Sequence, residues 1–207
     1  MSGRRAAAAV AGAAVLVAGC GHHARTPTTP TILTVTIPNG APVADVATAF
    51  SIAPGRAVTV AHAIGRRRTV LVAAPGERAR PARVVRTDAR LDLAVLAVRG
   101  LRTPVFATER LESGTWGFVQ VLRGTERITL HAQLLRKITA NVREAPGAAA
   151  QVRPALELRT AVEQGDSGAP VLDLNGRVIG MVFAQASNRD DRAYALDATA
   201  FRPAAER

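Results

Sequence analysis

The 207-residue sequence contains one cysteine and very few aromatic residues. The cysteine is Cys20, close to the N-terminus, so the domain that follows it folds without an internal disulfide. Aromatic residues make up 3% of the chain, which leaves Val, Leu, Ile and Ala to fill the interior. These features exclude a small disulfide-stapled scaffold, and the length suffices for one or two hydrophobic cores.

Lysine is almost absent as well, since Lys137 is the only lysine among 27 basic residues and the formal net charge is +11. Such an arginine excess can attract anionic lipids or acidic envelope polymers. A coding bias toward Arg and Ala explains the excess equally well, and it is the explanation we favour. The one compact basic run, Arg66-Arg67-Arg68, has no interleaved aromatic residues, so no nucleic-acid partner is predicted.

The first 19 residues predict an export signal helix, because a basic start at Arg4 and Arg5 precedes a short apolar run. The segment Val17-Ala18-Gly19-Cys20 resembles the bacterial lipobox, in which the cysteine is lipidated, for example with palmitate, and becomes the first mature residue. An ordinary signal peptide cut nearby is the alternative. Residues 20–30 are polar and proline-bearing, which indicates a tether between membrane and domain.

Helix patterns are scarce beyond the signal, and short β-branched or alternating runs recur instead. A composition change at 99–104 divides them into two halves, and 141–151 is rich in Ala, Gly and Pro, so it is expected to be a loop. The expected strands cover 31–37, 47–52, 56–61, 69–74, 82–86 and 93–98 in the first half, and 117–122, 128–135, 154–158, 171–174, 178–183 and 193–196 in the second.

Three polar residues stand at the ends of such runs in contexts suited to nucleophilic catalysis. Ser167 lies in the glycine-bracketed loop Gly165-Asp166-Ser167-Gly168, where converging backbone amides could receive an oxyanion. His62 ends one apolar run and Asp92 opens another. A serine hydroxyl needs a base, and the base needs a third group to orient it, so the order His, Asp, Ser predicts a triad. The alternative for the serine loop alone is a simple turn.

Together these motifs resemble the trypsin-like (chymotrypsin-fold) serine proteases over residues 45–200. The runs 82–88 and 171–180 are similar to the bacterial high-temperature-requirement branch, here expected without its PDZ domain. One departure is Ala169, where the family usually has a second glycine. The resemblance implies an all-β fold of two six-stranded antiparallel barrels. The expected divisions are a signal at 1–19, a tether at 20–30, an N-terminal barrel at 31–103 and a C-terminal barrel at 104–207.

The resemblance also implies the remaining site residues. The amides of Gly165 and Ser167 would form the oxyanion hole. In activatable members of the family the acid equivalent to Asp166 pairs with a newly cut N-terminus, but a lipidated Cys20 has no free amine. Asp166 is therefore expected to find an arginine, backbone amides or another constitutive partner. Five residues are expected to bind substrate around the residue before the cleaved bond, and no charge stands among them. They are Ala161, Val162, Phe183, Ala184 and Gln185.

The function predicted from the sequence is a serine endopeptidase that cleaves extracytoplasmic proteins or peptides without a metal or cofactor. It would be held on the outer face of the bacterial cell membrane by lipid on Cys20. The alternative is a lipoprotein of the same fold that serves binding or assembly, with latent or lost activity.

Overall fold

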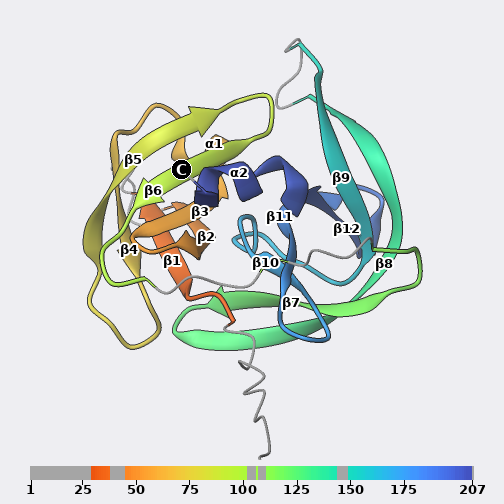
Figure 1. The fold of residues 1–207 in the computed structure, drawn as a ribbon, viewed down its shortest axis with the longest axis horizontal. Coiled ribbons are helices and arrows are strands. Elements are labelled where there is room, and N and C mark those ends of the chain that lie inside the picture. The colour runs from red at the N-terminus through yellow and green to blue at the C-terminus, as the bar shows by residue number, and fades with distance from the viewer. Residues whose placement is uncertain (1–28, 38–44, 102–105, 107–110, 144–148, 207) are drawn as a thin grey trace, which may run out of the picture.

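The computed structural model describes residues 29–37, 45–101, 106, 111–143 and 149–206. Their strands form two closed antiparallel barrels that lie side by side (Figure 1). The signal helix and Cys20 lie outside the described residues. The prediction of an all-β fold with two six-stranded barrels is confirmed.

The first barrel closes in the order β1-β2-β3-β6-β5-β4. Its strands are antiparallel neighbours throughout, and β3 pairs with β6 from Arg56 opposite Ala97 to Val60 opposite Leu93. The bounds are β1 (Ile32–Ile37), β2 (Asp45–Ala53), β3 (Arg56–Val60), β4 (Thr69–Ala73), β5 (Arg80–Asp88) and β6 (Leu93–Ala97).

The second barrel closes in the order β10-β11-β12-β9-β8-β7. Its longest hairpin joins β8 to β9, which remain paired as far as Val142 opposite Gln151. The loop expected at 141–151 is therefore shorter, because β8 includes Asn141 and Val142 and β9 begins at Gln151. The bounds are β7 (Trp116–Arg123), β8 (Glu126–Val142), β9 (Gln151–Arg159), β10 (Pro170–Asp173), β11 (Val178–Ala186) and β12 (Arg189–Asp197).

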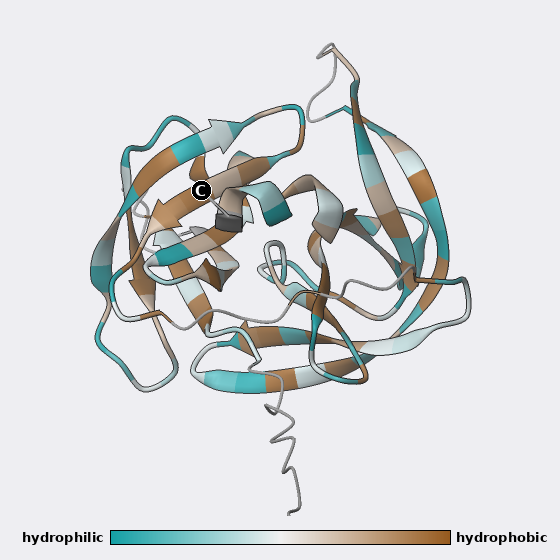
Figure 2. Cartoon of the chain, in the orientation of Figure 1, coloured by the Kyte–Doolittle hydropathy of each residue, from teal (hydrophilic) through white to brown (hydrophobic). Residues whose placement is uncertain are grey.

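Each barrel has its own apolar interior, and a third apolar cluster joins the two. Hydrophobic and hydrophilic residues alternate along outer strands such as β8, which have one buried face (Figure 2). Strands β3, β6 and β10 are almost entirely buried instead. The joining cluster unites Phe50 and Val58 of the first barrel with Met181 and Leu196 of the second. Aliphatic residues supply most of this interior, as the low aromatic content predicts.

Helices are short in the described part of the chain: α1 (Ala61–Ile64), the 3₁₀ turn η1 (Ala198–Ala200) and α2 (Arg202–Glu206). Helix α2 packs against β2, so the end of the chain returns to the first barrel (Figure 1). Phe201 just before it is fully buried, with its ring 5.9 Å from that of Phe50. None of these helices has the length and apolar run needed to cross a membrane.

Candidate active site

His62 lies on α1, directly after β3 has crossed the first barrel. Strand β3 is almost entirely buried, and its last residue, Val60, leads straight into the four-residue helix. Gly65 ends the helix with φ +59°, a backbone conformation that favours glycine. The helix is thus one tight turn, and it leaves the His62 side chain 42% exposed at its surface.

Asp92 ends the turn between β5 and β6 and faces His62. Its φ of +55° lies in the left-handed region that aspartate tolerates better than bulky residues do. The residue is 2% exposed. Oδ1 accepts from the His62 backbone amide at 2.8 Å, and Oδ2 lies 2.7 Å from His62 Nδ1. A carboxylate only accepts hydrogen bonds, so Nδ1 carries the proton and Nε2 is left as the basic nitrogen.

The loop of Ser167 belongs to the second barrel but docks on β2 and β3 of the first. The Ser167 carbonyl accepts from the Thr48 amide at 2.8 Å, and Thr48 Oγ1 donates to the Gly165 carbonyl at 3.2 Å. Thr59 Oγ1 donates to the Thr48 carbonyl at 2.7 Å. Thr59 precedes His62 by three residues, so the serine loop and the histidine rest on the same pair of strands.

Gly168 makes this docking possible. Its φ is +90°, and a Cβ built on it would lie 1.9 Å from the Thr48 carbonyl oxygen and 2.7 Å from Thr59 Oγ1. Gly165 also has a positive φ, of +98°. The two glycines that the sequence places around the serine are therefore required by backbone conformation, and Gly168 is required by close approach as well.

The amides around Ser167 divide into used and unused donors. The Asp166, Gly168 and Ala169 amides donate to carbonyls within the barrel. In the described part of the chain, no such acceptor is seen for the Gly165 and Ser167 amides. These two are the donors that the sequence assigns to an oxyanion hole.

Asp166 is buried beside the serine and is neutralised by Arg123 at the end of β7. Its Oδ2 accepts from Arg123 Nη2 at 2.9 Å and from the Glu163 amide at 2.8 Å. The hydrogen bond to Asp166 raises the pKa of the Arg123 guanidinium above its usual value. The expectation that an arginine or backbone amides satisfy Asp166 is confirmed, and both do so.

A second arginine, Arg153, lies behind Asp92 and was not anticipated from the sequence. Its side chain is fully buried, and Nη1 is 3.4 Å from Asp92 Oδ2. The only local signal is the phase of β9, in which Val152 is 52% exposed while Arg153 and Ala155 face inward. The chain has many arginines, so the alternation of inward and outward residues along β9 is not enough to identify Arg153 as a site residue.

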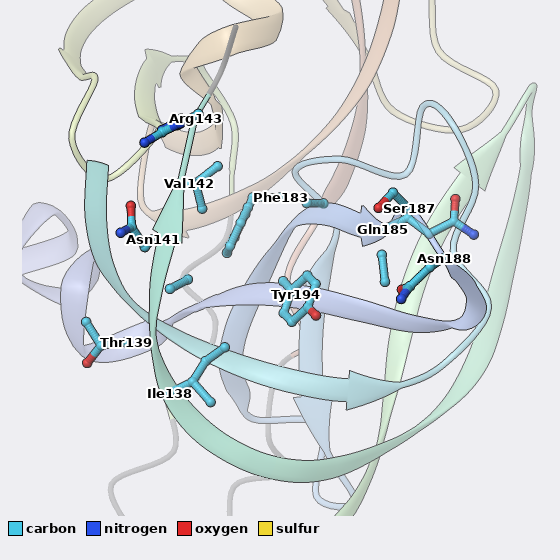
Figure 3. A pocket seen from close by; sticks show the side chains of 13 residues that line it. Ile138, Thr139, Asn141, Val142, Arg143, Phe183, Gln185, Ser187, Asn188 and Tyr194 are labelled. Carbon is cyan, nitrogen blue, oxygen red and sulfur yellow. The ribbon is translucent and has the colours of Figure 1, made fainter. Parts of the chain in front are cut away.

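A groove of about 580 Å³ runs between the C-terminal half of β8 and the C-terminal end of β11. Figure 3 shows Ile138 and Val142 on one side of it and Phe183 and Tyr194 on the other. Three of the predicted substrate contacts, Phe183, Ala184 and Gln185, line it. The other two do not: Ala161 is exposed elsewhere, and Val162 is 3% exposed within the interior of the second barrel.

Comparison with known proteins identifies the family to which this chain belongs. The trypsin-like peptidase domain matches residues 47–181. The serine proteases Rv3671c and MT3772 of two Mycobacterium tuberculosis strains are each 36% identical over 155 residues, which cover 73% of this chain and 39% of each relative. The chain therefore spans well under half the length of these curated relatives.

Similar solved structures support the same family assignment. The active form of the M. tuberculosis Rv3671c protease is similar with a TM-score of 0.75 and 30% identity, over 87% of this chain and 81% of that one. The HtrA-type protease AlgW has a TM-score of 0.69 at 18% identity over 84% and 58%, a likeness in fold alone. The relatives that are at least 30% identical to this chain are serine proteases. The chain belongs to the trypsin-like peptidase family.

The fit around Gly168 leads to a first prediction. Gly168→Ala should lower the free energy of unfolding by about 2–4 kcal/mol, because it adds backbone strain and a collision with the Thr48 carbonyl. Gly124→Ala is the matched control: its φ is +65° with no atom within 4 Å of the added carbon, so about 1 kcal/mol is expected. Urea unfolding of both variants measures the difference, and equal losses would contradict the docking role.

The ion pair at Asp166 leads to a second prediction. Arg123→Met should destabilise the protein by about 2–4 kcal/mol, since it leaves a carboxylate that is 2% exposed without its cation. Glu163→Gln removes the other partner of Arg123, whose side chain is 67% exposed, and should change stability by less than about 1 kcal/mol. Thermal unfolding at neutral pH compares the two, and a larger effect from Glu163 would reverse the assignment.

Proposed function

We propose that this chain is a serine endopeptidase that hydrolyses peptide bonds of extracytoplasmic proteins through His62, Asp92 and Ser167. The observation that carries the proposal is the pair of hydrogen bonds from His62 to a buried Asp92. Support comes also from the loop of Ser167, which rests on the strands that lead to His62. The class of the relatives is consistent with it.

The proposed chemistry starts with the Ser167 hydroxyl. Its oxygen attacks the substrate carbonyl carbon while His62 Nε2 takes its proton, and Asp92 stabilises the imidazolium that results. The carbonyl oxygen becomes an oxyanion that accepts from the Gly165 and Ser167 amides, which are unused within the described fold. Collapse of this intermediate breaks the C–N bond, and His62 gives its proton to the leaving amine. Water then attacks the acyl-enzyme by the same route.

Substrate selection is proposed to use the end of β11 and the segment before the serine loop. Phe183, Ala184 and Gln185 line the groove, where an extended peptide could add beside β11 as a further strand. Ala161, at the position expected to form the pocket floor, carries no charge, which favours small or apolar residues before the cleaved bond over Lys or Arg.

A fluorophosphonate probe tests the proposed nucleophile on the full chain in detergent. Labelling should be complete in the unmodified protein and absent in Ser167→Ala. His62→Gln and Asp92→Asn should slow it by about 10³-fold or more, because the serine loses its base or the base its orientation. Mass spectrometry of the labelled peptide identifies the site.

His131→Gln provides the matched control, since His131 lies on β8 of the second barrel with its ring 5.6 Å from that of Phe118. Its labelling rate should equal that of the unmodified protein. A folded protein that no active-site probe labels would support the binding or assembly alternative instead. Release of fragments from casein, lost in Ser167→Ala, extends the test from serine reactivity to peptide-bond hydrolysis.

We further propose that the protein is exported and anchored by lipid on Cys20, with sequence residues 1–20 as the support. Cys20→Ser should abolish incorporation of an alkyne-labelled fatty acid and move the protein from membrane to soluble extracytoplasmic fractions, while probe labelling of Ser167 persists. His22→Ser is the neighbouring control and should leave the protein in the membrane. Retention of Cys20→Ser in membranes without lipid would count against the anchor.

A further inference from the structure

Arg153 is the most deeply buried ionised side chain near the site, and it joins the two barrels. It projects from β9 of the second barrel, with no exposed side-chain surface. Its Nη1 lies 3.4 Å from Oδ2 of Asp92, which belongs to the first barrel. Its guanidinium carbon lies 5.2 Å from the centroid of the Phe183 ring, within range of a cation–π interaction.

The same carboxylate oxygen therefore serves two cationic partners. Asp92 Oδ2 is 2.7 Å from His62 Nδ1 and 3.4 Å from Arg153 Nη1. The guanidinium is permanently charged, whereas the imidazole is charged only when protonated. In a buried setting, charges at this separation interact far more strongly than they do in water.

Two consequences follow from this geometry. A fixed positive charge beside Asp92 attracts its carboxylate and keeps the carboxylate oxygen directed at the His62 ring. The same charge repels a proton arriving on the imidazole, so His62 remains neutral at a lower pH than it would beside Asp92 alone. A triad base accepts a proton from serine only when it is neutral.

We propose that Arg153 is a positioning residue of the site: it holds the Asp92 carboxylate against His62 and extends the proposed activity toward acidic pH. The inference rests on the proposed function for its effect on activity, but not for its effect on His62. Among the described residues, His62 on α1 and Arg153 on β9 each place a nitrogen within 4 Å of Asp92 Oδ2. This arginine lies on β9, a strand that carries none of the three proposed catalytic residues.

A purely structural role, in which Arg153 only fastens the barrels together, predicts something different. Its removal would then lower stability without changing how His62 titrates. The titration of His62 therefore separates the two roles, and it can be observed without any turnover.

The experiment follows the imidazole resonances of the full chain by NMR, in the Ser167→Ala background, as pH is varied. His62→Gln assigns the signal, and His131 serves as an internal reference. Arg153→Met should move the midpoint of the His62 titration to higher pH by about one unit. Arg153→Lys keeps the charge and should restore most of that difference. His131 should titrate identically in all of these proteins.

Arg159→Met is the matched control, since Arg159 is exposed at the other end of β9 and interacts with Gln133 rather than Asp92. It should leave the His62 midpoint unchanged. If Arg153→Met does not fold, as judged by circular dichroism, Arg153→Gln retains a polar side chain without the charge and gives the same comparison.

Activity provides the second readout. In chains that retain Ser167, the acidic limb of the fluorophosphonate labelling rate should move to higher pH in Arg153→Met by the same amount as the His62 midpoint. A folded Arg153→Met with an unchanged His62 midpoint overturns the inference. A shifted midpoint in a chain that never labels supports the role of Arg153 at His62 and overturns the proposed function instead.

Discussion

The docking of the Ser167 loop on Thr48 is the contact on which the arrangement of the site depends. It is made largely by backbone groups, with the Thr48 amide donating to the Ser167 carbonyl at 2.8 Å. From the neighbouring strand β3, the Thr59 hydroxyl donates a hydrogen bond to the Thr48 carbonyl. Gly168 has no side chain and so leaves room for this carbonyl and this hydroxyl. A backbone contact of this kind has little freedom to adjust, so the serine loop takes its position from β2 and β3.

Buried acids close to this contact are each paired with arginine. Asp92 meets Arg153, and Asp166 meets Arg123. Burying a carboxylate is unfavourable unless hydrogen bonds and an opposite charge accompany it. Arginine suits these positions because its planar group can face a carboxylate while also stacking on an aromatic ring, as Arg153 does on Phe183. Two residues of the arginine excess therefore neutralise buried carboxylates, whether or not a coding bias produced the excess.

The fold could be predicted because its signal is local. Alternating apolar runs identify strands, and a His or Asp at the end of such a run stands out against its neighbours. Arg123 and Arg153 could not be found in this way. Arg123 precedes a glycine and has the pattern of a turn residue, while Arg153 owes its importance to where β9 faces the other barrel. Val162 is 3% exposed in the interior of the second barrel because the barrel closes around it, and closure is not a local property.

Each barrel contributes a residue to the site that is contacted by a residue of the other barrel. Asp92 belongs to the first barrel and is contacted by Arg153 from the second, while Ser167 belongs to the second and is held by Thr48 from the first. The apolar cluster around Phe50 and Met181 fills the space between them. A displacement of one barrel would therefore disturb both polar contacts together. Since the only cysteine is Cys20, this reciprocal arrangement fixes the barrels in a domain that has no disulfide to do so.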